Sequence, residues 1–336
     1  MNYKEEDINK YIKLYLDNRK MGLDLSGVAL LAHGYFEMRD SLIRMAHNYD
    51  VLPFDPSEMI NDYTMHLLTI FFIFNSSNKM FTYVGENFIK EYVKNESEIE
   101  GVNDLSIHGI EEMKGLEAMY KYINSGENEY STGSMILTDL HEKLFSFVND
   151  GEYSRRYRTA PAYLPCSGVE LEESYMIPRA MRTSERLFDE LFEESERMYN
   201  SEMEDKIHMV NPFLAKLMKY NAELVRIHPF PDGNGRSIRG LINFLLERAG
   251  LPPVYVKAAE RGKYHEAMNK AIVEDDYTKL INFYKNKLCY SIEELVIEPF
   301  VYALKEYDLR KEEEESKKQK GSNLLRVLKN EEKPKE

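Results

Sequence analysis

The sequence predicts a mainly α-helical protein that carries one short β element. Apolar residues recur at three and four positions along most of the chain, which is the spacing of one face of a helix. β-branched and aromatic residues that flank a turn are found in one stretch, residues 153–176, which is expected to form a hairpin. The segments with helical spacing are 5–17, 26–47, 57–75, 111–123, 136–148, 178–198, 211–226, 236–249 and 292–308.

Composition is that of an ordinary soluble protein. With 336 residues, 43% of them apolar, the chain can bury a core and accommodate one large domain plus a smaller one. The 58 acidic and 44 basic residues give a formal net charge of -14, which repels nucleic acid and anionic membranes, so neither is an expected partner. Cys166 and Cys289 lie far apart, which excludes a disulfide framework and a cysteine-based zinc site.

The amino terminus has no signal-peptide pattern, because it is charged from its fourth residue. The longest apolar run, Met65 to Phe74, is too short to cross a bilayer. We therefore expect a cytoplasmic protein, with specialised export as a toxin or effector left open.

Residues 1–85 are expected to form an amino-terminal helical region. Their methionines and aromatic residues are most simply explained as core. An alternative is that Tyr35, Phe36 and the run 65–74 form a surface for a partner or for a homodimer.

The expected hairpin at 153–176 turns at Pro165-Cys-Ser-Gly168, and Pro161 places one of its strands at an edge. An edge strand has unpaired N–H and C=O groups that can receive an extended peptide. The alternative is an irregular surface hairpin without a partner.

The carboxyl-terminal part divides into a helix over 291–310 and a charged tail over 311–336. Apart from the stretch NLLRVL, the tail has too few apolar residues to bury a face. We expect a frayed helix that runs into a disordered tail.

The stretch 226–239 reads RIHPFPDGNGRSIR and is expected to form a loop that runs into a helix. Pro229 and Pro231 oppose helix formation, and Gly233 and Gly235 permit backbone angles closed to other residues. Helical spacing of apolar residues begins directly afterwards. A helix amino terminus behind a glycine-containing loop is a typical anion site, because its N–H groups are unpaired and its dipole is positive.

Four side chains in this stretch suit phosphate chemistry. Arg236 and Arg239 lie one turn apart on one face at the positive end of the helix dipole, where only a negative group compensates them. Asp232 offers a hard oxygen ligand for magnesium, and His228 has the pKa range of a general base. Together they indicate nucleotidyl or phosphoryl transfer.

Residues 228–239 match the Fic signature, His-x-Phe-x-Asp/Glu-Gly-Asn-Gly-Arg-x-x-Arg, at every specified position. The segment 249–268 resembles the family's sequence after its motif helix, and 157–164 resembles its target-binding flap. On this resemblance we expect a Fic-type helical core over 104–290, with the β-hairpin as its flap.

The resemblance implies a protein adenylyltransferase that moves AMP from ATP to a Ser, Thr or Tyr hydroxyl of a protein held on the 157–164 flap, and also of itself. His228 would accept the hydroxyl proton and Asp232 would hold Mg2+. The anion cradle would be Gly233, Asn234 and Gly235, with Arg236 on the β-phosphate and Arg239 on the γ-phosphate. Glycine at 235 goes with AMP transfer, whereas the related Doc branch has lysine there and transfers phosphate. Adenine would pack near Asn243, Arg261, Tyr264 and His265.

A second resemblance concerns residues 86–103, which are expected to form an inhibitory helix that ends near Gly101. Glu100 lies at the negative end of this helix, which is unfavourable without a cation opposite. The sequence Ser97-Glu-Ile-Glu-Gly101 resembles the Fic inhibitory motif, Ser/Thr-x-x-x-Glu-Gly/Asn, although Glu96 stands at its Ser/Thr position and Ser97 comes one place later. The resemblance implies that Glu100 pairs with Arg239 and denies it to the γ-phosphate.

Two alternatives to the transferase remain at this point. One is the reverse reaction, in which Glu100 orients water to remove AMP from a protein. The other is a non-catalytic regulatory module with the same fold, although such a module has no need of the four functional side chains together. The other histidines form no metal-ligand spacing and are expected to be structural or superficial; they are at positions 33, 47, 66, 108, 141, 208 and 265.

Overall fold

The structure is a computed structural model. It describes residues 5–20, 86–102, 105–125, 132–148, 155–164 and 168–331, with short pieces within 27–34 and 64–72. Residues 52–292 form one compact unit, and residues 1–51 with 293–336 form another. The predicted surface residues Tyr35 and Phe36 lie outside the described residues.

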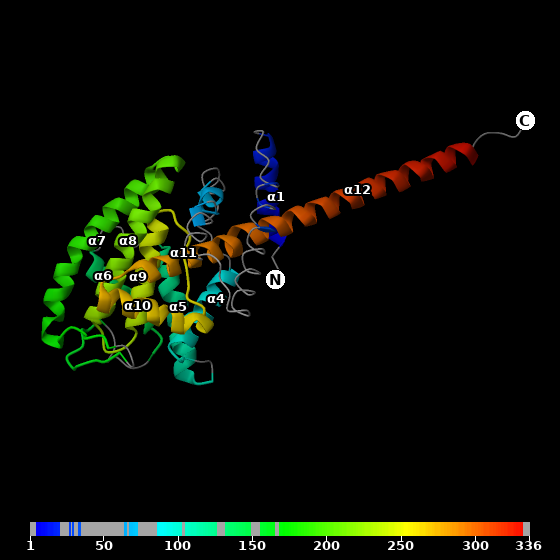
Figure 1. The fold of residues 1–336 in the computed structure, drawn as a ribbon. Helices are drawn as coiled ribbons and strands as arrows, with labels where there is room; N and C mark the ends of the chain where they lie inside the picture. Colours follow the sequence, from blue (N-terminus) through cyan, green and yellow to red (C-terminus); the bar gives the residue numbers. More distant parts are fainter. Residues whose placement is uncertain are drawn as a thin grey trace, which may run out of the picture. The chain divides into compact units, whose positions relative to one another are not determined.

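The larger unit is helical, and its described residues contain no β-strand (Figure 1). The helices of this unit whose bounds are described are α4 (Glu86–Ile99), α5 (Ile107–Ile123), α6 (Gly133–Leu144), α7 (Ile177–Asn200), α8 (Met203–Ile227), α9 (Asn234–Arg248), α10 (Arg261–Glu274) and α11 (Thr278–Ile292). Short 3-10 turns, Ser174–Met176 and Ala258–Glu260, precede α7 and α10. The predicted mainly α fold is confirmed.

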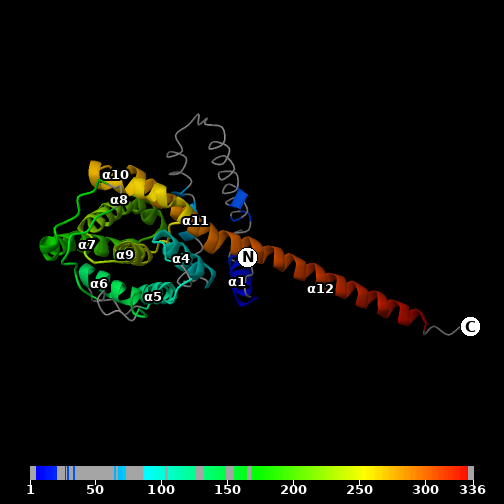
Figure 2. The same cartoon turned by 90° about the horizontal axis from the view of Figure 1, so that it is seen from below.

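Helix α9 is the centre of this unit. It packs against α5, α6, α7 and α8 (Figure 2). Nearly all of its side chains are buried. Helices α10 and α11 pack together and against α8, while α4 packs on α5. A central helix surrounded in this way has fixed ends, so the loop at its amino terminus is held by the core.

Capping bonds fix the two helices that cover α9 on one side. Ser106 caps α5 by accepting a hydrogen bond from the N–H of Gly109 at 3.0 Å. The carboxylate of Glu185, on α7, accepts from the N–H groups of Gly133 and Ser134 at 3.0 and 2.8 Å. A carboxylate at the positive end of α6 therefore ties this helix to α7.

The apolar run at 65–74 is core where it is described. Leu67, Leu68, Phe71 and Phe72 are all buried. This burial favours the core interpretation of the run over the surface for a partner or homodimer.

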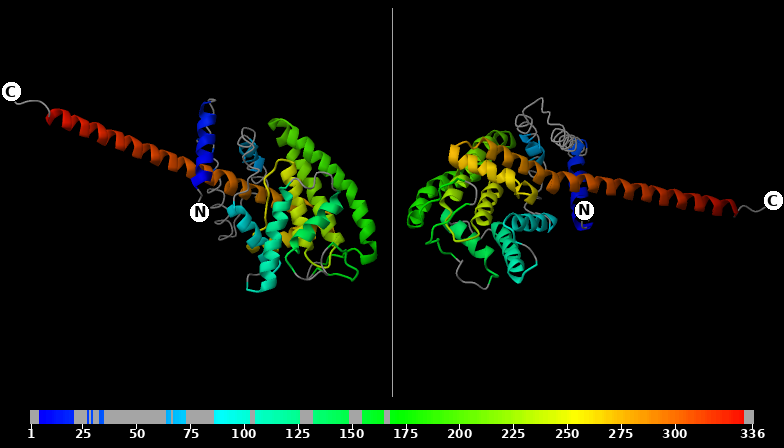
Figure 3. Two further views of the ribbon diagram at one scale, coloured as in Figure 1. Left: turned by 180° about the vertical axis from the view of Figure 1, so that it is seen from behind. Right: turned by 60° about the horizontal axis from the view of Figure 1, so that its bottom comes forward.

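In its described residues the smaller unit contains α1 (Glu5–Lys20), a π-helical turn (Glu293–Ile297) and α12 (Glu298–Glu331). Helix α1 packs across α12 (Figure 3). The Tyr11 hydroxyl donates to the Leu295 carbonyl at 2.7 Å. Helix α12 continues past residue 310, where the sequence predicts a frayed helix and a tail. No helix in the described part of the chain is both long and apolar enough to cross a membrane.

The β-hairpin expected at 153–176 is not found. Residues 155–164 and 168–173 carry no strand, and the turn at 165–167 lies outside the described residues. Instead of pairing with each other, the two segments bond to the end of α8. The N–H of Arg158 donates to Pro229 O at 2.8 Å, and that of Glu172 donates to Arg226 O at 3.1 Å. These bonds use the backbone groups that a ladder would need, so the flap is an irregular loop anchored beside residue 228.

Candidate active site

His228 stands at the junction of α8 and the loop that precedes α9. Its backbone is left-handed, with φ 49° and ψ 62°, and its N–H donates to Leu224 O at 2.9 Å as the carboxyl-terminal cap of α8. This conformation is rare for a residue other than glycine and costs about 1 kcal/mol. The surrounding contacts must therefore hold it, and they set the direction of the imidazole.

Asn234 and Phe230 close the loop on itself. The Asn234 side chain accepts from the Phe230 N–H at 2.8 Å and donates to the Phe230 carbonyl at 2.7 Å. Phe230 is fully buried. The Asn234 side chain thus fixes the loop shape and leaves only its backbone N–H for the predicted anion cradle.

His141 supports the same loop from α6. Its ring is fully buried and stacks on Phe230 with ring centroids 3.9 Å apart, and its Nε2 donates to the Asp232 carbonyl at 3.0 Å. His141 was expected to be either structural or superficial, and these contacts give it a structural role beside the site. Burial lowers its pKa to about 4, although the Asp232 carbonyl and carboxylate favour the charged form.

We expect His141 to make folding sensitive to mild acid. Because the folded-state pKa is below the unfolded value of about 6.5, its contribution is fully present above pH 6.5 and is lost as the pH falls towards 4. The full loss is on the order of 3 kcal/mol, of which about 2 kcal/mol is lost between pH 7 and pH 5. Denaturant unfolding of the wild type and of His141→Gln at pH 7 and pH 5 measures it. Gln keeps an N–H donor without titrating, so its free energy of unfolding should fall less. Equal losses in both proteins would contradict the assignment.

The amino terminus of α9 has the features of an anion site. Its cap, Gly233, is left-handed with φ 72° and offers no side chain to the first N–H groups of the helix. A Cβ added at Gly233 would lie 2.6 Å from the Phe145 ring, so glycine is required by both angle and space. The first N–H groups of α9 are thus left to an external anion.

Asp232 fits the predicted magnesium ligand. Its side chain is 57% exposed, and its Oδ1 accepts from the Gly233 N–H at 2.6 Å. Oδ2 lies 3.8 Å from Arg236 Nη2 and accepts no other contact from the described residues. Magnesium is commonly held by one or two carboxylates together with substrate phosphates and water, which a single accessible carboxylate at an anion site allows. The described residues contain no cluster that would hold a metal without a substrate.

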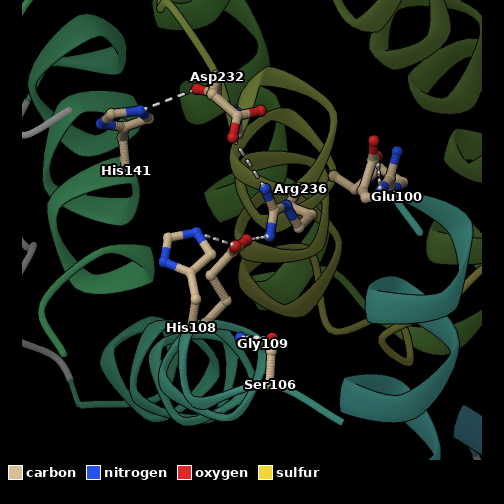
Figure 4. Close-up of polar contacts among 10 residues, drawn as sticks. Glu100, Ser106, His108, Gly109, His141, Asp232 and Arg236 are labelled. Atoms are coloured by element: carbon tan, nitrogen blue, oxygen red, sulfur yellow. Dashed lines mark hydrogen bonds and ion pairs between the residues drawn. The ribbon is translucent and has the colours of Figure 1, made fainter. Parts of the chain in front are cut away.

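Arg236 is buried and is held from α5. Its Nη1 donates to Glu112, and Glu112 is also bonded by His108 Nε2 at 2.8 Å (Figure 4). Glu112 is buried, whereas His108 is largely exposed. The buried Nε of Arg236 has no hydrogen-bond partner among the described residues. The guanidinium is therefore compensated by Glu112 while one N–H remains for a further acceptor.

Arg239 is bound by two carboxylates of α4 and its end. Its Nε donates to Glu96 Oε2 at 2.6 Å, and its Nη2 donates to Glu100 Oε1 at 2.9 Å. Gly101, with φ 76°, follows Glu100 and ends the helix. The Glu100 carboxylate is 33% exposed, whereas that of Glu96 is fully buried. The pairing of Glu100 with Arg239 is thus present, together with a second partner that the sequence did not indicate.

The two carboxylates shift in opposite directions because their exposure differs. Burial raises the pKa of Glu96, and Arg239 offsets this only in part. Burial acts in the same direction on Glu100, but Arg239, Arg236 and Arg261 together lower the pKa of that carboxyl. Burial alone would lower the pKa of Arg239, yet the two glutamates raise it well above its ordinary value. Glu100 therefore stays ionised at neutral pH.

Gly235 faces the Glu100–Arg239 pair. A Cβ at this position would lie 2.6 Å from Glu100 Oε1 and 2.9 Å from Arg239 Nη1. A side chain at 235 is therefore incompatible with the pair as it stands. Ser97, assigned together with Glu100 to the inhibitory motif, is buried, and its Oγ has no hydrogen-bond partner among the described residues. It does not contact Arg239, and Glu96 takes that place.

Three of the four residues assigned to adenine lie near Arg239. The Tyr264 ring is 5.8 Å from the Arg239 guanidinium carbon and 5.9 Å from the His265 ring. Arg261 is exposed and lowers the pKa of Glu100. Asn243 is different, since its amide is buried and bonds both the N–H and the carbonyl of Val254 at 2.8 Å. These bonds give Asn243 a structural role.

The His228 imidazole is held largely neutral. Burial lowers its pKa, the positive charge of Arg158 lowers it further, and the Val225 carbonyl, Glu100 and Asp232 act in the opposite direction. Nδ1 is buried without a hydrogen bond of normal geometry. A neutral imidazole with a free second nitrogen can accept a proton.

Comparison with known proteins identifies part of this arrangement. Residues 133–246 match the family model described as Fic/DOC family. "Protein adenylyltransferase Fic" of Drosophila mojavensis is 32% identical over 187 residues, which are 54% of this chain and 33% of the relative. The protein of the same name in Drosophila melanogaster is 31% identical over 186 residues, with the same coverage. The chain thus spans about a third of the length of these curated relatives.

Solved structures show the same fold. A Fic domain containing signaling protein from Bacteroides thetaiotaomicron superposes with a TM-score of 0.52 at 21% identity, over 64% of this chain and 87% of that one. Fic-1 from C. elegans gives a TM-score of 0.53 at 18% identity, over 73% and 71%. The family match covers α6 to α9, whereas Glu96, Glu100 and α10 lie outside it. The segment 133–246, which carries His228, Asp232, Arg236 and Arg239, therefore matches the Fic/DOC family model.

Proposed function

We propose that this protein is an adenylyltransferase that moves AMP from Mg-ATP to a Ser, Thr or Tyr hydroxyl of a protein, and that Glu100 restrains the reaction. The observation that carries the proposal is the loop 228–233, in which His228, whose pKa is lowered by burial, and the exposed Asp232 carboxylate directly precede the amino terminus of α9 with its glycine cap. The names of the relatives, which are adenylyltransferases, support the same activity.

In the proposed reaction the acceptor oxygen attacks the α-phosphorus of ATP. The new bond joins this oxygen to phosphorus, and the bond from phosphorus to the oxygen shared with the β-phosphate breaks, so pyrophosphate leaves. The hydroxyl proton passes to Nε2 of His228, the ring nitrogen opposite the buried Nδ1. The N–H groups behind Gly233 receive the phosphate oxygens as charge develops on them.

The arginines bind the two outer phosphates. Arg236 is fixed by Glu112 through Nη1, and its Nη2, which lies 3.8 Å from Asp232 Oδ2, would donate to the β-phosphate. Arg239 has to leave Glu100 before it can bind the γ-phosphate, because its Nη2 donates to that carboxylate at rest. Magnesium on Asp232 would neutralise charge on the phosphates as pyrophosphate departs.

Magnesium dependence gives a sharp prediction at Asp232. The variant Asp232→Asn keeps an oxygen for the Gly233 N–H but loses the charge, so the loop should stay folded while metal-dependent turnover falls at least about 100-fold. Transfer rates against magnesium concentration, with a chelator as reference, measure this. Unchanged turnover in Asp232→Asn, or full wild-type activity in chelator, would remove Asp232 as the metal ligand.

Restraint by Glu100 is supported by charge as well as by contact. Arg239 carries one positive charge and faces two carboxylates, so the resting cluster has a formal charge of -1 beside the site proposed for the γ-phosphate. A hundredfold restraint needs about 2.7 kcal/mol, which is within the range of a partly buried Arg–carboxylate pair.

Removal of AMP is a second candidate reaction, supported by the ionised state and partial exposure of Glu100. A carboxylate in this state can orient a water molecule for attack on a phosphodiester. Incubation with a pre-adenylylated protein tests this reaction directly.

The proposed transfer is tested with ATP labelled either at the α-phosphate or at the γ-phosphate, with magnesium and a cell lysate. Label should enter protein from the α-position alone, and mass spectrometry of the labelled bands should identify the modified hydroxyls. Label from the γ-position alone would indicate phosphoryl transfer. No label from either, in the wild type and in Glu100→Gly, together with no release of AMP, would favour a non-catalytic module.

A further inference from the structure

The flap residue Arg158 is a buried charged residue beside His228, with 4% of its surface exposed. No carboxylate of the described residues lies within ion-pair distance of its guanidinium. It is satisfied by backbone carbonyls instead. Nε donates to His228 O at 2.7 Å, Nη1 to Ala160 O at 3.0 Å, and Nη2 to Glu172 O and to Ile227 O, the latter at 3.3 Å.

Two of these carbonyls belong to the end of α8. Ile227 is its last residue and His228 is its cap, so both carbonyls lie at the negative end of the helix dipole, where a cation is favoured. The N–H of Arg158 adds a bond to Pro229 O at 2.8 Å. Arg158 therefore bonds the peptide groups on the carboxyl side of His228 with both its side chain and its backbone. Contacts of this kind hold a strained left-handed residue in place.

The other two carbonyls belong to the two segments of the flap loop, 155–164 and 168–173. Ala160 lies on the first segment and Glu172 on the second, and the N–H of Glu172 donates to Arg226 O at 3.1 Å. One guanidinium thus joins both segments of the flap to the residue that carries the imidazole. Lysine could not do this, since an ammonium lacks the planar five-donor fork that these four carbonyls occupy.

We infer that Arg158 is a positioning residue of the proposed transfer reaction, which fixes His228 and the flap as one rigid unit. An acceptor hydroxyl presented along the flap then meets the imidazole at a set distance, without Arg158 touching substrate. This inference rests on the proposed function of His228. A misplacement of about 1 Å in such a pair costs roughly 100-fold in rate.

The charge of Arg158 provides a readout that a purely structural role would not give. Its loss should raise the pKa of His228, because Arg158 is among the causes that lower it. The other groups that act on the imidazole are Asp232 and the Val225 carbonyl, which stay in place, and Glu100, which is absent from every variant compared because all of them carry Glu100→Gly. The acid limb of the pH–rate profile should therefore move to higher pH in a neutral variant and stay near its original position in Arg158→Lys.

The test uses the full chain carrying Glu100→Gly, with Arg158→Gln and Arg158→Lys added singly. Arg156→Gln is the matched control, because Arg156 is exposed and lies two residues away. We expect kcat for transfer from α-labelled ATP to fall roughly 100-fold in both Arg158 variants, with KM for ATP changed less than about 3-fold, and no change in the control. The His228 imidazole, assigned in NMR spectra against His228→Ala, should titrate at higher pH in Arg158→Gln only.

Each outcome of these measurements either supports or overturns the inference. An Arg158→Gln protein with the melting temperature of its parent, but unchanged kcat and unchanged His228 titration, would overturn the inference. If Arg158→Gln does not fold, the test is made with the folded Arg158→Lys protein. An unchanged kcat in Arg158→Lys would then overturn the inference. If the Glu100→Gly parent transfers no label, the proposed function fails. The NMR titration without ATP still reports on Arg158 in that case, and an unmoved His228 then overturns the inference independently.

Discussion

Replacement of His228 by Ala is expected to abolish AMP transfer while leaving the fold and nucleotide binding intact. The imidazole lies at the end of α8 and contributes little to the core, whereas a general base contributes about 100- to 10,000-fold to the rate. Transfer from α-labelled ATP, measured in a Glu100→Gly background, should fall by that factor. ATP affinity, measured by calorimetry, should stay within about 3-fold because Arg236, Arg239 and Asp232 are untouched.

Two controls separate chemistry from backbone strain at His228. Asn tolerates the left-handed conformation better than Ala does, so His228→Asn preserves the loop and should be as inactive as His228→Ala. His208→Ala removes an exposed histidine of the same helix and should retain full activity. Transfer by His228→Asn at the rate of its parent would show that the imidazole is not the base.

The fold class could be predicted because long helices with a clear apolar stripe dominate the chain. Helices α7, α8 and α9 were all expected, although α8 begins at Met203, before the predicted start at residue 211. Helices α10 and α11 were not predicted. The buried face of α10 contains Ala267 and Ala271, which give a weak apolar signal, and that of α11 contains Lys285 and Lys287. Lys287 is paired with Glu260, a contact that periodicity cannot show.

The β-hairpin was predicted wrongly because the sequence pattern does not show what the segment packs against. Alternating aromatic and β-branched residues indicate a strand only when its backbone pairs with another strand. Here the Tyr157 ring lies 6.0 Å from that of Phe230, and the neighbouring N–H of Arg158 bonds Pro229. The pattern therefore reflects packing against the 226–230 segment rather than a sheet.

The functional side chains within 228–239 could be located from the sequence because a single loop carries them. The residues that pair with these side chains could not be located from the sequence. Glu112 is 124 residues from Arg236, and Glu96 is 143 residues from Arg239, so only the tertiary fold brings them together. Glu96 was noted as a departure from the inhibitory motif, and its role as a second ligand of Arg239 has no local signature. The role of Arg158 could not be predicted either, because it bonds backbone carbonyls, which every residue type carries.

The largest gain of activity is expected from Glu100→Gly. At rest Arg239 Nη2 donates to Glu100, and removal of this carboxylate leaves the cluster of Arg239 and Glu96 formally neutral. Arg239 keeps its bond from Nε to Glu96, so its outer N–H groups remain directed by the protein and become available to the γ-phosphate. Transfer should rise on the order of 100-fold, which corresponds to about 2.7 kcal/mol. Self-modification with α-labelled ATP measures the rise most simply.

The control for Glu100→Gly is Glu98→Gly, which replaces an exposed glutamate of the same helix. Both variants introduce glycine near the end of α4, but only the first removes a ligand of Arg239. Transfer by Glu98→Gly should match the wild type. Arg239→Ala should not imitate the activation, since it removes the proposed γ-phosphate ligand, and the double variant with Glu100→Gly should resemble Arg239→Ala alone.

The degree of activation in Glu100→Gly is expected to depend on Glu96. Its buried carboxylate still faces Arg239 in Glu100→Gly, so the γ-phosphate competes with one remaining negative charge. Adding Glu96→Gln keeps an acceptor for Arg239 Nε and removes that charge, which should tighten ATP binding beyond the level of Glu100→Gly. Measurement of ATP affinity and transfer rate in the single and double variants separates the two carboxylates. If Glu100→Gly is folded, binds ATP and transfers AMP no faster than the wild type, Glu100 is not the brake, and its contact with Arg239 is structural.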